Sequence, residues 1–127
     1  MWQYGLTSGW ENDSRLYSTT KPNEFAAVMS NLRRYFALLK ASRSSGAVEA
    51  AYIHREASGV VAVDSYGFDG VEPTRIYTFA DDQKRVLHLL CIGKTETKET
   101  EMAYCKNLVY YIVNEPKQTT TTTEGRA

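Results

Sequence analysis

TRIYTFADDQKRVLHLLCIGK, residues 74–94, carries the secondary-structure pattern from which the fold class of this 127-residue chain is predicted. Residues 74–79 alternate in character, which predicts a β-strand. The polar segment at 81–84 predicts a tight hairpin turn. Residues 85–92 are almost entirely apolar, as expected of a strand at the centre of a sheet. Because short turns join antiparallel neighbours, the stretch predicts an antiparallel hairpin.

Two further strands are expected before this hairpin. Residues 50–56 predict an extended segment, and residues 57–59 predict a turn. Residues 60–65 are rich in β-branched side chains and predict another strand. A longer loop is expected at 67–73, where glycine, aspartate and proline gather. The pattern therefore predicts an antiparallel sheet of about four strands.

A long amphipathic helix is predicted ahead of the sheet. Pro22 suits the first helical turn, where its missing N–H is not needed, and Glu24 favours the positive start of the helix. The helix is expected to end near Ala41, before a serine-rich segment. Apolar residues with helical spacing line one face: Phe25, Val28, Met29, Leu32, Phe36 and Leu39.

The two ends of the chain carry weaker patterns. Residues 2–6 are consistent with a short strand, and the polar residues 7–20 predict a loop. A second helix is predicted to stop at Pro116, and the threonine-rich tail, 117–127, is expected to be disordered. The second helix is predicted to start at Thr95, Thr97 or Lys98. Its apolar stripe consists of Met102, Cys105, Leu108, Val109 and Ile112. The fold class predicted is α+β: helix, sheet, helix.

Composition limits the function classes. Apolar residues make up 43% of the chain, which excludes disorder of the whole. Basic and acidic residues number 15 each, so the formal net charge is zero. A dedicated nucleic-acid binder is usually basic, so RNA binding by this chain requires a local patch of positive charge.

The cysteines, histidines and apolar runs predict an ordinary interior and a cytoplasmic location. Cys91 and Cys105 lie in apolar stretches and are expected to be buried small hydrophobes, although a disulfide is left open. With the distant His54 and His88 they make no zinc pattern, so we expect no metal. No apolar run approaches membrane-spanning length, and residues 1–5 lack a charged leader before an apolar core. We therefore expect no signal peptide and no membrane contact.

Residues 74–94 resemble the signature of the RelE/ParE/HigB toxin superfamily, in which an arginine opens a strand, an acidic turn follows, and an apolar strand ends in Gly-Lys before the last helix. Residues 23–39 (NEFAAVMSNLRRYFALL) and 52–64 (YIHREASGVVAVD) resemble a subgroup of small toxin-like proteins found near mobile elements and phages. The resemblance covers roughly residues 22–113 and implies that residues 1–116 form one RelE-like domain with a microbial ribonuclease fold.

The resemblance also implies a function. Typical members cleave mRNA in the ribosomal decoding site, a related branch poisons DNA gyrase, and a small antitoxin silences both. It therefore implies the toxin of a type II toxin–antitoxin system, an mRNA endoribonuclease that acts at the ribosome and needs no cofactor. The alternative is a non-catalytic module of the same fold that binds gyrase or another partner. A third hypothesis is an unrelated domain that shares only the order of its elements.

Cleavage of this kind requires removal of the 2′-OH proton, neutralisation of the phosphorane and protonation of the 5′-oxygen. Arg75 matches the arginine that the family places on a central strand, and the alternative is an ion pair with Asp64 or Asp81. His54 is the acid–base candidate, because histidine alone titrates near neutrality unaided. The alternative for His54 is a partly exposed structural histidine. Lys94 is a candidate phosphate contact, and the alternative for it is a solvated loop lysine.

Additional residues complete the candidate site. Candidate RNA-binding residues are Arg55, Lys98, Tyr77 and Tyr104, although core packing is the ordinary role of a tyrosine. His88 is expected in a satisfied core position. Where RNA-cleaving members carry paired lysines, this chain has Ala62 and Asp64, and Thr95 and Glu101 replace an arginine and a tyrosine of the family. The resemblance therefore implies a non-standard active site around His54, Arg75 and Lys94.

Overall fold

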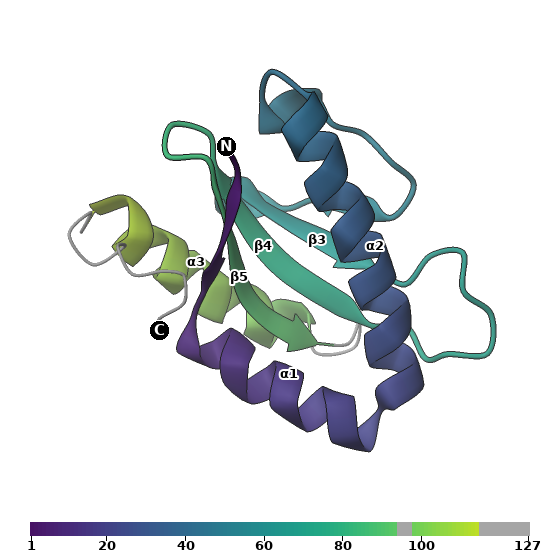
Figure 1. The fold of residues 1–127 in the computed structure, drawn as a ribbon. Coiled ribbons are helices and arrows are strands. Elements are labelled where there is room, and N and C mark those ends of the chain that lie inside the picture. Colours follow the sequence, from purple (N-terminus) through teal and green to yellow (C-terminus); the bar gives the residue numbers. More distant parts are fainter. Residues whose placement is uncertain (94–97, 115–127) are drawn as a thin grey trace.

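The computed structural model describes residues 1–93 and 98–114, which form an α+β structure of three α-helices and a five-stranded mixed sheet (Figure 1). The elements are β1 (Gln3–Leu6), α1 (Ser8–Thr20), α2 (Pro22–Ala41), β2 (Ile53–Arg55), β3 (Val60–Asp64), β4 (Arg75–Asp81), β5 (Val86–Gly93) and α3 (Lys98–Asn114). Single 3-10 turns at Ser45–Ala47 and Ala57–Gly59 flank β2.

The sheet has the strand order β1-β5-β4-β3-β2, with β5 inside it as predicted. Strands β2 to β5 form the antiparallel arrangement expected from the sequence. β1 confirms the short strand expected near the start, but it pairs in parallel with β5, Gln3 opposite Val86. The expectation of an antiparallel sheet of about four strands is thus corrected to a mixed sheet of five. Parallel neighbours need a long crossover connection, and the chain between β1 and β5 provides it.

The loop predicted over residues 7–20 is wrong, because Ser8–Thr20 form α1. The Thr7 side chain caps the helix by accepting a hydrogen bond from the Trp10 N–H at 3.1 Å. Trp10 is the buried residue of α1. The remaining positions are largely polar, so the usual apolar periodicity of a helix is missing from the sequence. The Asp13 carboxylate accepts the Ile92 N–H at 2.9 Å, so α1 covers the part of the β5 edge beyond β1.

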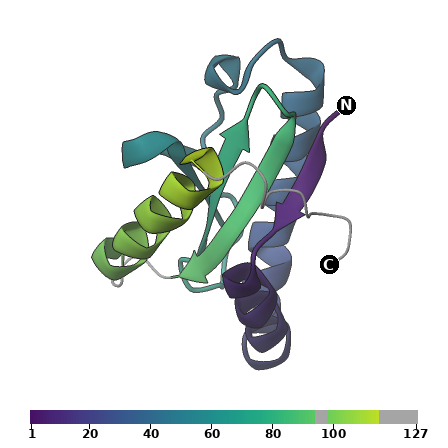
Figure 2. The same ribbon diagram turned by 90° about the vertical axis from the view of Figure 1, so that its left-hand side faces the viewer.

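Two helices cover opposite faces of the sheet (Figure 2). The predicted helix over 22–41 is confirmed as α2, which packs on the face that carries Val61, Val63 and Ile76. α3 packs on the other face, where Cys105 lies among the side chains of Ala62, Tyr77 and Cys91. Both cysteines are buried free thiols, as expected, with their Sγ atoms 3.8 Å apart.

Some expectations fall outside the described residues: the helix starts at Thr95 and Thr97, the stop at Pro116 and the disordered tail over 117–127. Among the described residues, α3 begins at Lys98, which is the third predicted start. Within the described ranges, no helix is both long enough and apolar enough to cross a membrane.

Candidate functional site

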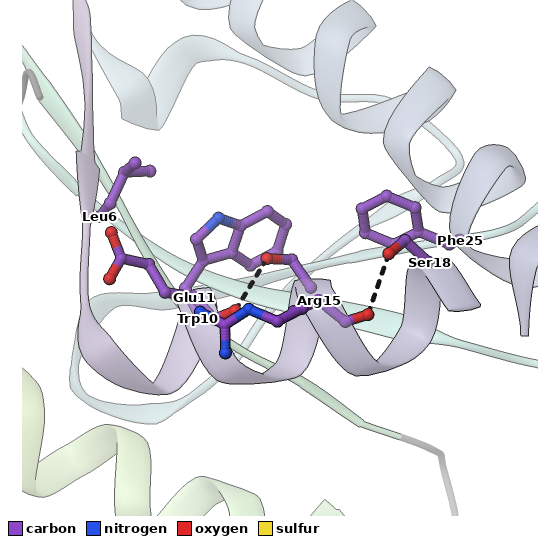
Figure 3. Close-up of a pocket in the computed structure, with 7 residues that line it drawn as sticks. Leu6, Trp10, Glu11, Arg15, Ser18 and Phe25 are labelled. Atoms are coloured by element: carbon purple, nitrogen blue, oxygen red, sulfur yellow. Dashed lines mark hydrogen bonds between the residues drawn. The ribbon is translucent and has the colours of Figure 1, made fainter. Parts of the chain in front are cut away.

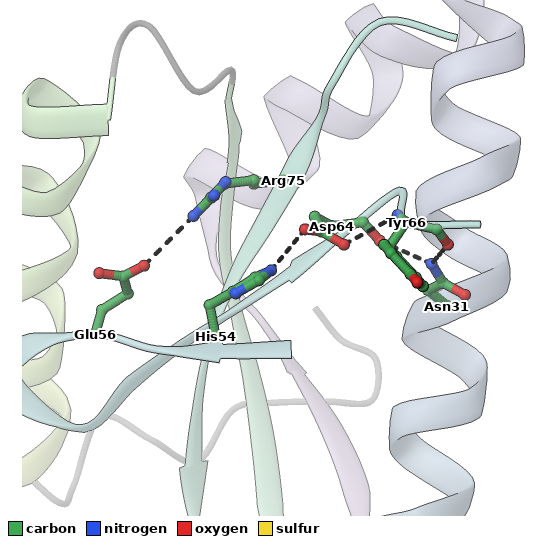
Figure 4. A network of polar contacts seen from close by, with 6 residues as sticks. All are labelled: Asn31, His54, Glu56, Asp64, Tyr66 and Arg75. Carbon is green, nitrogen blue, oxygen red and sulfur yellow. Dashed lines mark hydrogen bonds and ion pairs between the residues drawn. The ribbon is translucent and has the colours of Figure 1, made fainter. Parts of the chain in front are cut away.

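The candidate site lies on the α3-facing side of the sheet, where β3 ends and β4 begins. Asp64 pairs with Arg75 across β3 and β4, and His54 pairs with Ala62 across β2 and β3. Because side chains alternate along a strand, Ala62 and Asp64 share a face, and their partners share it with them. The fold therefore brings His54, Asp64 and Arg75 to one face from three neighbouring strands (Figure 4).

His54 and Asp64 form a close pair. His54 Nε2 lies 2.6 Å from Asp64 Oδ2, and the His54 side chain is 40% exposed. His54 is thus partly exposed and lies on a strand, an arrangement compatible with either role considered for it. An ionised carboxylate only accepts hydrogen bonds, so beside ionised Asp64 the imidazole carries its proton on Nε2. Nδ1 of a neutral His54 is then the nitrogen that accepts a proton.

Asp64 is held from behind by α2. The fully buried side chain of Asn31 donates to the carbonyl oxygens of Asp64 (2.9 Å) and Tyr66 (3.0 Å). The Tyr66 N–H in turn donates to Asp64 Oδ1 at 3.0 Å. Arg34 lies 3.3 Å from the Asn31 side-chain oxygen, to which it donates. These contacts fix both the carboxylate and the first turn of the loop that follows it (Figure 4).

A second carboxylate, that of Glu56, pairs with two described cations. Glu56 Oε2 lies 3.4 Å from Arg75 Nη1, and Glu56 Oε1 lies 3.2 Å from Lys98 Nζ. Glu56 and Arg75 are only 13% and 17% exposed, while Lys98 on α3 is 41% exposed. The ion-pair partner of Arg75 is thus Glu56, not Asp64 or Asp81. Glu56 engages one guanidinium nitrogen, and an arginine has five N–H donors, so the capacity to bind an anion remains.

A pocket of about 250 Å³ opens beside these residues, which we name the β3–β4 pocket. Asp64 and Arg75 lie at the two strand ends that border it, and the loop between the strands supplies the remaining walls. Besides Asp64 and Arg75, the residues that line it include Tyr66, Phe68, Val71 and Pro73. The pocket and the His54–Asp64 pair therefore have the residue Asp64 in common.

No known protein family, curated protein or solved structure significantly matches this chain. Within the described part of the chain, no three His, Cys, Asp or Glu side chains gather closely enough to hold a metal ion.

A larger hollow of about 530 Å³ runs along α1 (Figure 3). Trp10 and Phe25 line it together with Glu11 and Arg15. Its serine hydroxyls bond to their own helix: Ser14 donates to Glu11 O at 3.3 Å and Ser18 to Arg15 O at 2.9 Å. Among the described residues that line it, none is a histidine or a cysteine.

The other predicted RNA-binding residues lie elsewhere. Arg55 donates from Nη2 to the carbonyl oxygens of Ser45 (3.2 Å) and Val48, and so fastens the segment before β2. Tyr77 is fully buried, and burial raises the pKa of its phenol above the usual value. Tyr104 is half-exposed on α3, with its hydroxyl against Gly9 of α1. Lys94 is outside the described residues.

His88 is buried as expected, but its position is not a satisfied one. Its ring lies 6.1 Å from that of Phe79, centroid to centroid. Among the described residues, Nε2 of His88 has no hydrogen-bond partner. Burial lowers the pKa of His88 to about 4, so it is a neutral core residue at physiological pH.

Sequence reasoning missed the roles of Asn31, Glu56 and Tyr66. Asn31 carried a usable signal, because it is a polar residue next to Leu32 on the buried face of an amphipathic helix. Glu56 and Tyr66 carried no such signal: one follows a short strand and the other lies in a loop. Their partners are 19 and 35 residues away in the chain, so only the fold brings them together.

Proposed function

We propose that this chain is the toxin of a type II toxin–antitoxin system and cleaves ribosome-bound mRNA without a metal. The observation that carries the proposal is the 2.6 Å pair between His54 and Asp64, placed beside Arg75 at the border of a pocket. A histidine oriented by a carboxylate, next to an arginine, is an arrangement suited to phosphodiester cleavage. The resemblance of residues 22–113 to the RelE/ParE/HigB superfamily supports the same reaction.

In the proposed reaction, His54 Nδ1 removes the proton of a ribose 2′-OH. The 2′-oxygen attacks the adjacent phosphorus, and the bond from phosphorus to the 5′-oxygen breaks. The products are a 2′,3′-cyclic phosphate and a 5′-OH whose proton comes from water. Arg75 neutralises the charge that gathers on the phosphorane, since its planar fork matches phosphate oxygens. Asp64 holds His54 in the tautomer that this step needs and stabilises the imidazolium that forms.

The test is tightly controlled expression in a bacterial host, followed by growth and by mapping of mRNA ends. Wild-type protein should arrest growth and produce new 5′-hydroxyl ends, and both effects should be lost in His54→Ala and Arg75→Ala. Arg33→Ala, an exposed arginine on α2, is the matched control and should behave as wild type. Normal growth and intact mRNA with folded wild-type protein would overturn the proposal. Rescue of growth by a co-expressed small protein would identify the cognate antitoxin.

One observation favours the alternative, a non-catalytic module that binds gyrase or another partner. Glu56 engages both Arg75 and Lys98, so much of the local positive charge is already neutralised. With a formal net charge of zero, the chain gains no general attraction to RNA. Growth arrest that persists in His54→Ala and Arg75→Ala, with mRNA intact, would select this alternative.

A further inference from the structure

We infer, resting on the proposed function, that the β3–β4 pocket takes one unpaired nucleobase of single-stranded RNA, with Tyr66 stacked on its face. The location supports this assignment. The pocket is bordered by Asp64 and Arg75, the residues that orient His54 and bind phosphate in the proposed reaction. A base held there places its own sugar and phosphate beside the His54–Asp64 pair.

The lining of the pocket matches the chemistry of a base. Tyr66 is 63% exposed, so its ring is open to stacking, and Phe68 is a partly exposed aromatic wall. Val71 and Pro73 add apolar surface, while Asp64 and Arg75 offer an acceptor and donors to polar edges. Proteins that recognise single-stranded RNA combine aromatic faces for the bases with such polar groups.

The size of the pocket restricts the occupant. A space of about 250 Å³ is smaller than the roughly 300–1,000 Å³ typical of sites for drug-sized ligands. It suits a single planar base, not a base pair. Bases within a duplex are stacked on one another and must leave the helix before they enter such a pocket. The substrate class is therefore single-stranded RNA.

The walls of the pocket are anchored at both ends of the loop. At the start, Asn31 holds the carbonyl oxygen of Tyr66 at 3.0 Å. At the end, the Glu72 N–H donates to the Glu24 carboxylate at 3.0 Å, and the Glu72 carboxylate meets Lys21 Nζ at 2.9 Å. All three partners belong to α2 or its cap. A pocket that is already shaped loses less conformational entropy when it binds.

The loop also owes its shape to two glycines. Gly67 has φ of +92° and Gly70 has φ of +79°, a region that favours glycine. Among the described residues, apart from the neighbours of each glycine in the chain, no heavy atom lies within 4 Å of where a Cβ would stand on either residue. Backbone conformation, and not crowding, therefore requires these glycines, so the turns that form the pocket are encoded locally.

The test is direct binding of a fluorescent ten-nucleotide RNA whose 2′-positions are O-methylated, which removes the attacking hydroxyl. Binding by wild type and Tyr66→Phe should be similar, while Tyr66→Ala should bind roughly tenfold more weakly, the usual scale for loss of one stacked base. Tyr110→Ala is the matched control, because Tyr110 on α3 is also 63% exposed. It should bind as wild type does.

The outcomes separate this inference from the proposed function. RNA binding that depends on Tyr66, in a protein that cleaves no RNA, would support base binding by the pocket and overturn the proposed ribonuclease function. Cleavage by wild type, with Tyr66→Ala binding as tightly as wild type, would overturn the pocket and leave the nuclease standing. Equal competition by duplex RNA or by free AMP would also overturn the inference, because the occupant would not be a base of a single strand.

Discussion

The side-chain amide of Asn31, fully buried on α2, donates to the carbonyl oxygen of Asp64 at the end of β3 over 2.9 Å. The same amide also holds the carbonyl oxygen of Tyr66. One helix residue therefore fixes both the carboxylate that orients His54 and the loop that forms the β3–β4 pocket. This relationship links the stability of the fold to the geometry of the candidate site.

Asn31→Ala should lower the free energy of unfolding by about 1–3 kcal/mol, because two carbonyl groups lose a buried donor. It should also weaken RNA cleavage, since the loop and Asp64 lose their support. Urea unfolding and the mRNA-end assay measure the two effects. Asn23→Ala, an exposed position on the same helix, serves as control. Equal stability of the two variants would show that the Asn31 hydrogen bonds contribute little.

Glu56→Gln should strengthen RNA binding and weaken the fold. The carboxylate neutralises Arg75 and Lys98, so its removal leaves two cations free to contact phosphate and steepens the salt dependence of binding. The partly buried ion pairs are lost, which should cost about 1–2 kcal/mol of stability, between the exposed and buried cases. Salt titrations of RNA affinity, with exposed Glu49→Gln as control, measure the effect. An unchanged salt dependence would place the phosphates elsewhere.

Tyr77→Phe separates a role in the core from a role in catalysis. The Tyr77 hydroxyl is buried and, among the described residues, has no hydrogen-bond partner. Its removal should leave stability unchanged or raise it by up to about 1 kcal/mol, because no hydrogen bond is lost. RNA cleavage should be unchanged. A large loss of cleavage by a stable Tyr77→Phe protein would return Tyr77 to the candidate site. Thermal unfolding and the mRNA-end assay give the two readings.

The sequence predicts well those elements that have a clear hydrophobic pattern within their own residues. Helix α2 has apolar residues at helical spacing, and the hairpin combines an alternating strand, a polar turn and an apolar strand. Both form as expected. The sequence did not predict helix α1 because Trp10 is its one buried residue, so the helix has no apolar stripe. Its start is marked only by the Thr7 cap. The parallel pairing of β1 was missed because it joins residues some 83 positions apart, such as Gln3 and Val86.

The candidate site divides in the same way. His54 and Arg75 follow from chemistry that a single residue type suggests. They share one face because strand register sets them opposite Ala62 and Asp64, which lie on the same face of β3. Their partners Asp64 and Glu56 are selected by strand register and by the reach of long side chains, which no local pattern encodes. Asp64 is also held by Asn31 of α2, which lies 33 residues earlier in the chain. Long-range contacts of the fold therefore determine the partners of His54 and Arg75.

His88 should make the stability of the protein depend on pH. Burial lowers its folded-state pKa to about 4, whereas the unfolded chain has the ordinary value of about 6.5. As the pH falls through 6.5, the unfolded state therefore binds a proton that the folded state refuses. Stability should fall between about pH 6.5 and 4, by up to about 3 kcal/mol, and this group should add no further loss below pH 4.

His88→Leu removes the titrating group while it keeps an apolar side chain against Phe79. Urea unfolding at pH 7 and pH 4.5 should therefore show a smaller loss of stability in His88→Leu than in wild type. The difference between the two proteins isolates His88, because the carboxylates titrate in both. Equal losses in both proteins would mean that His88 gains its proton in the folded state as readily as in the unfolded one. The imidazole would then have to reach solvent or a partner, since a buried cation without either is too costly to form.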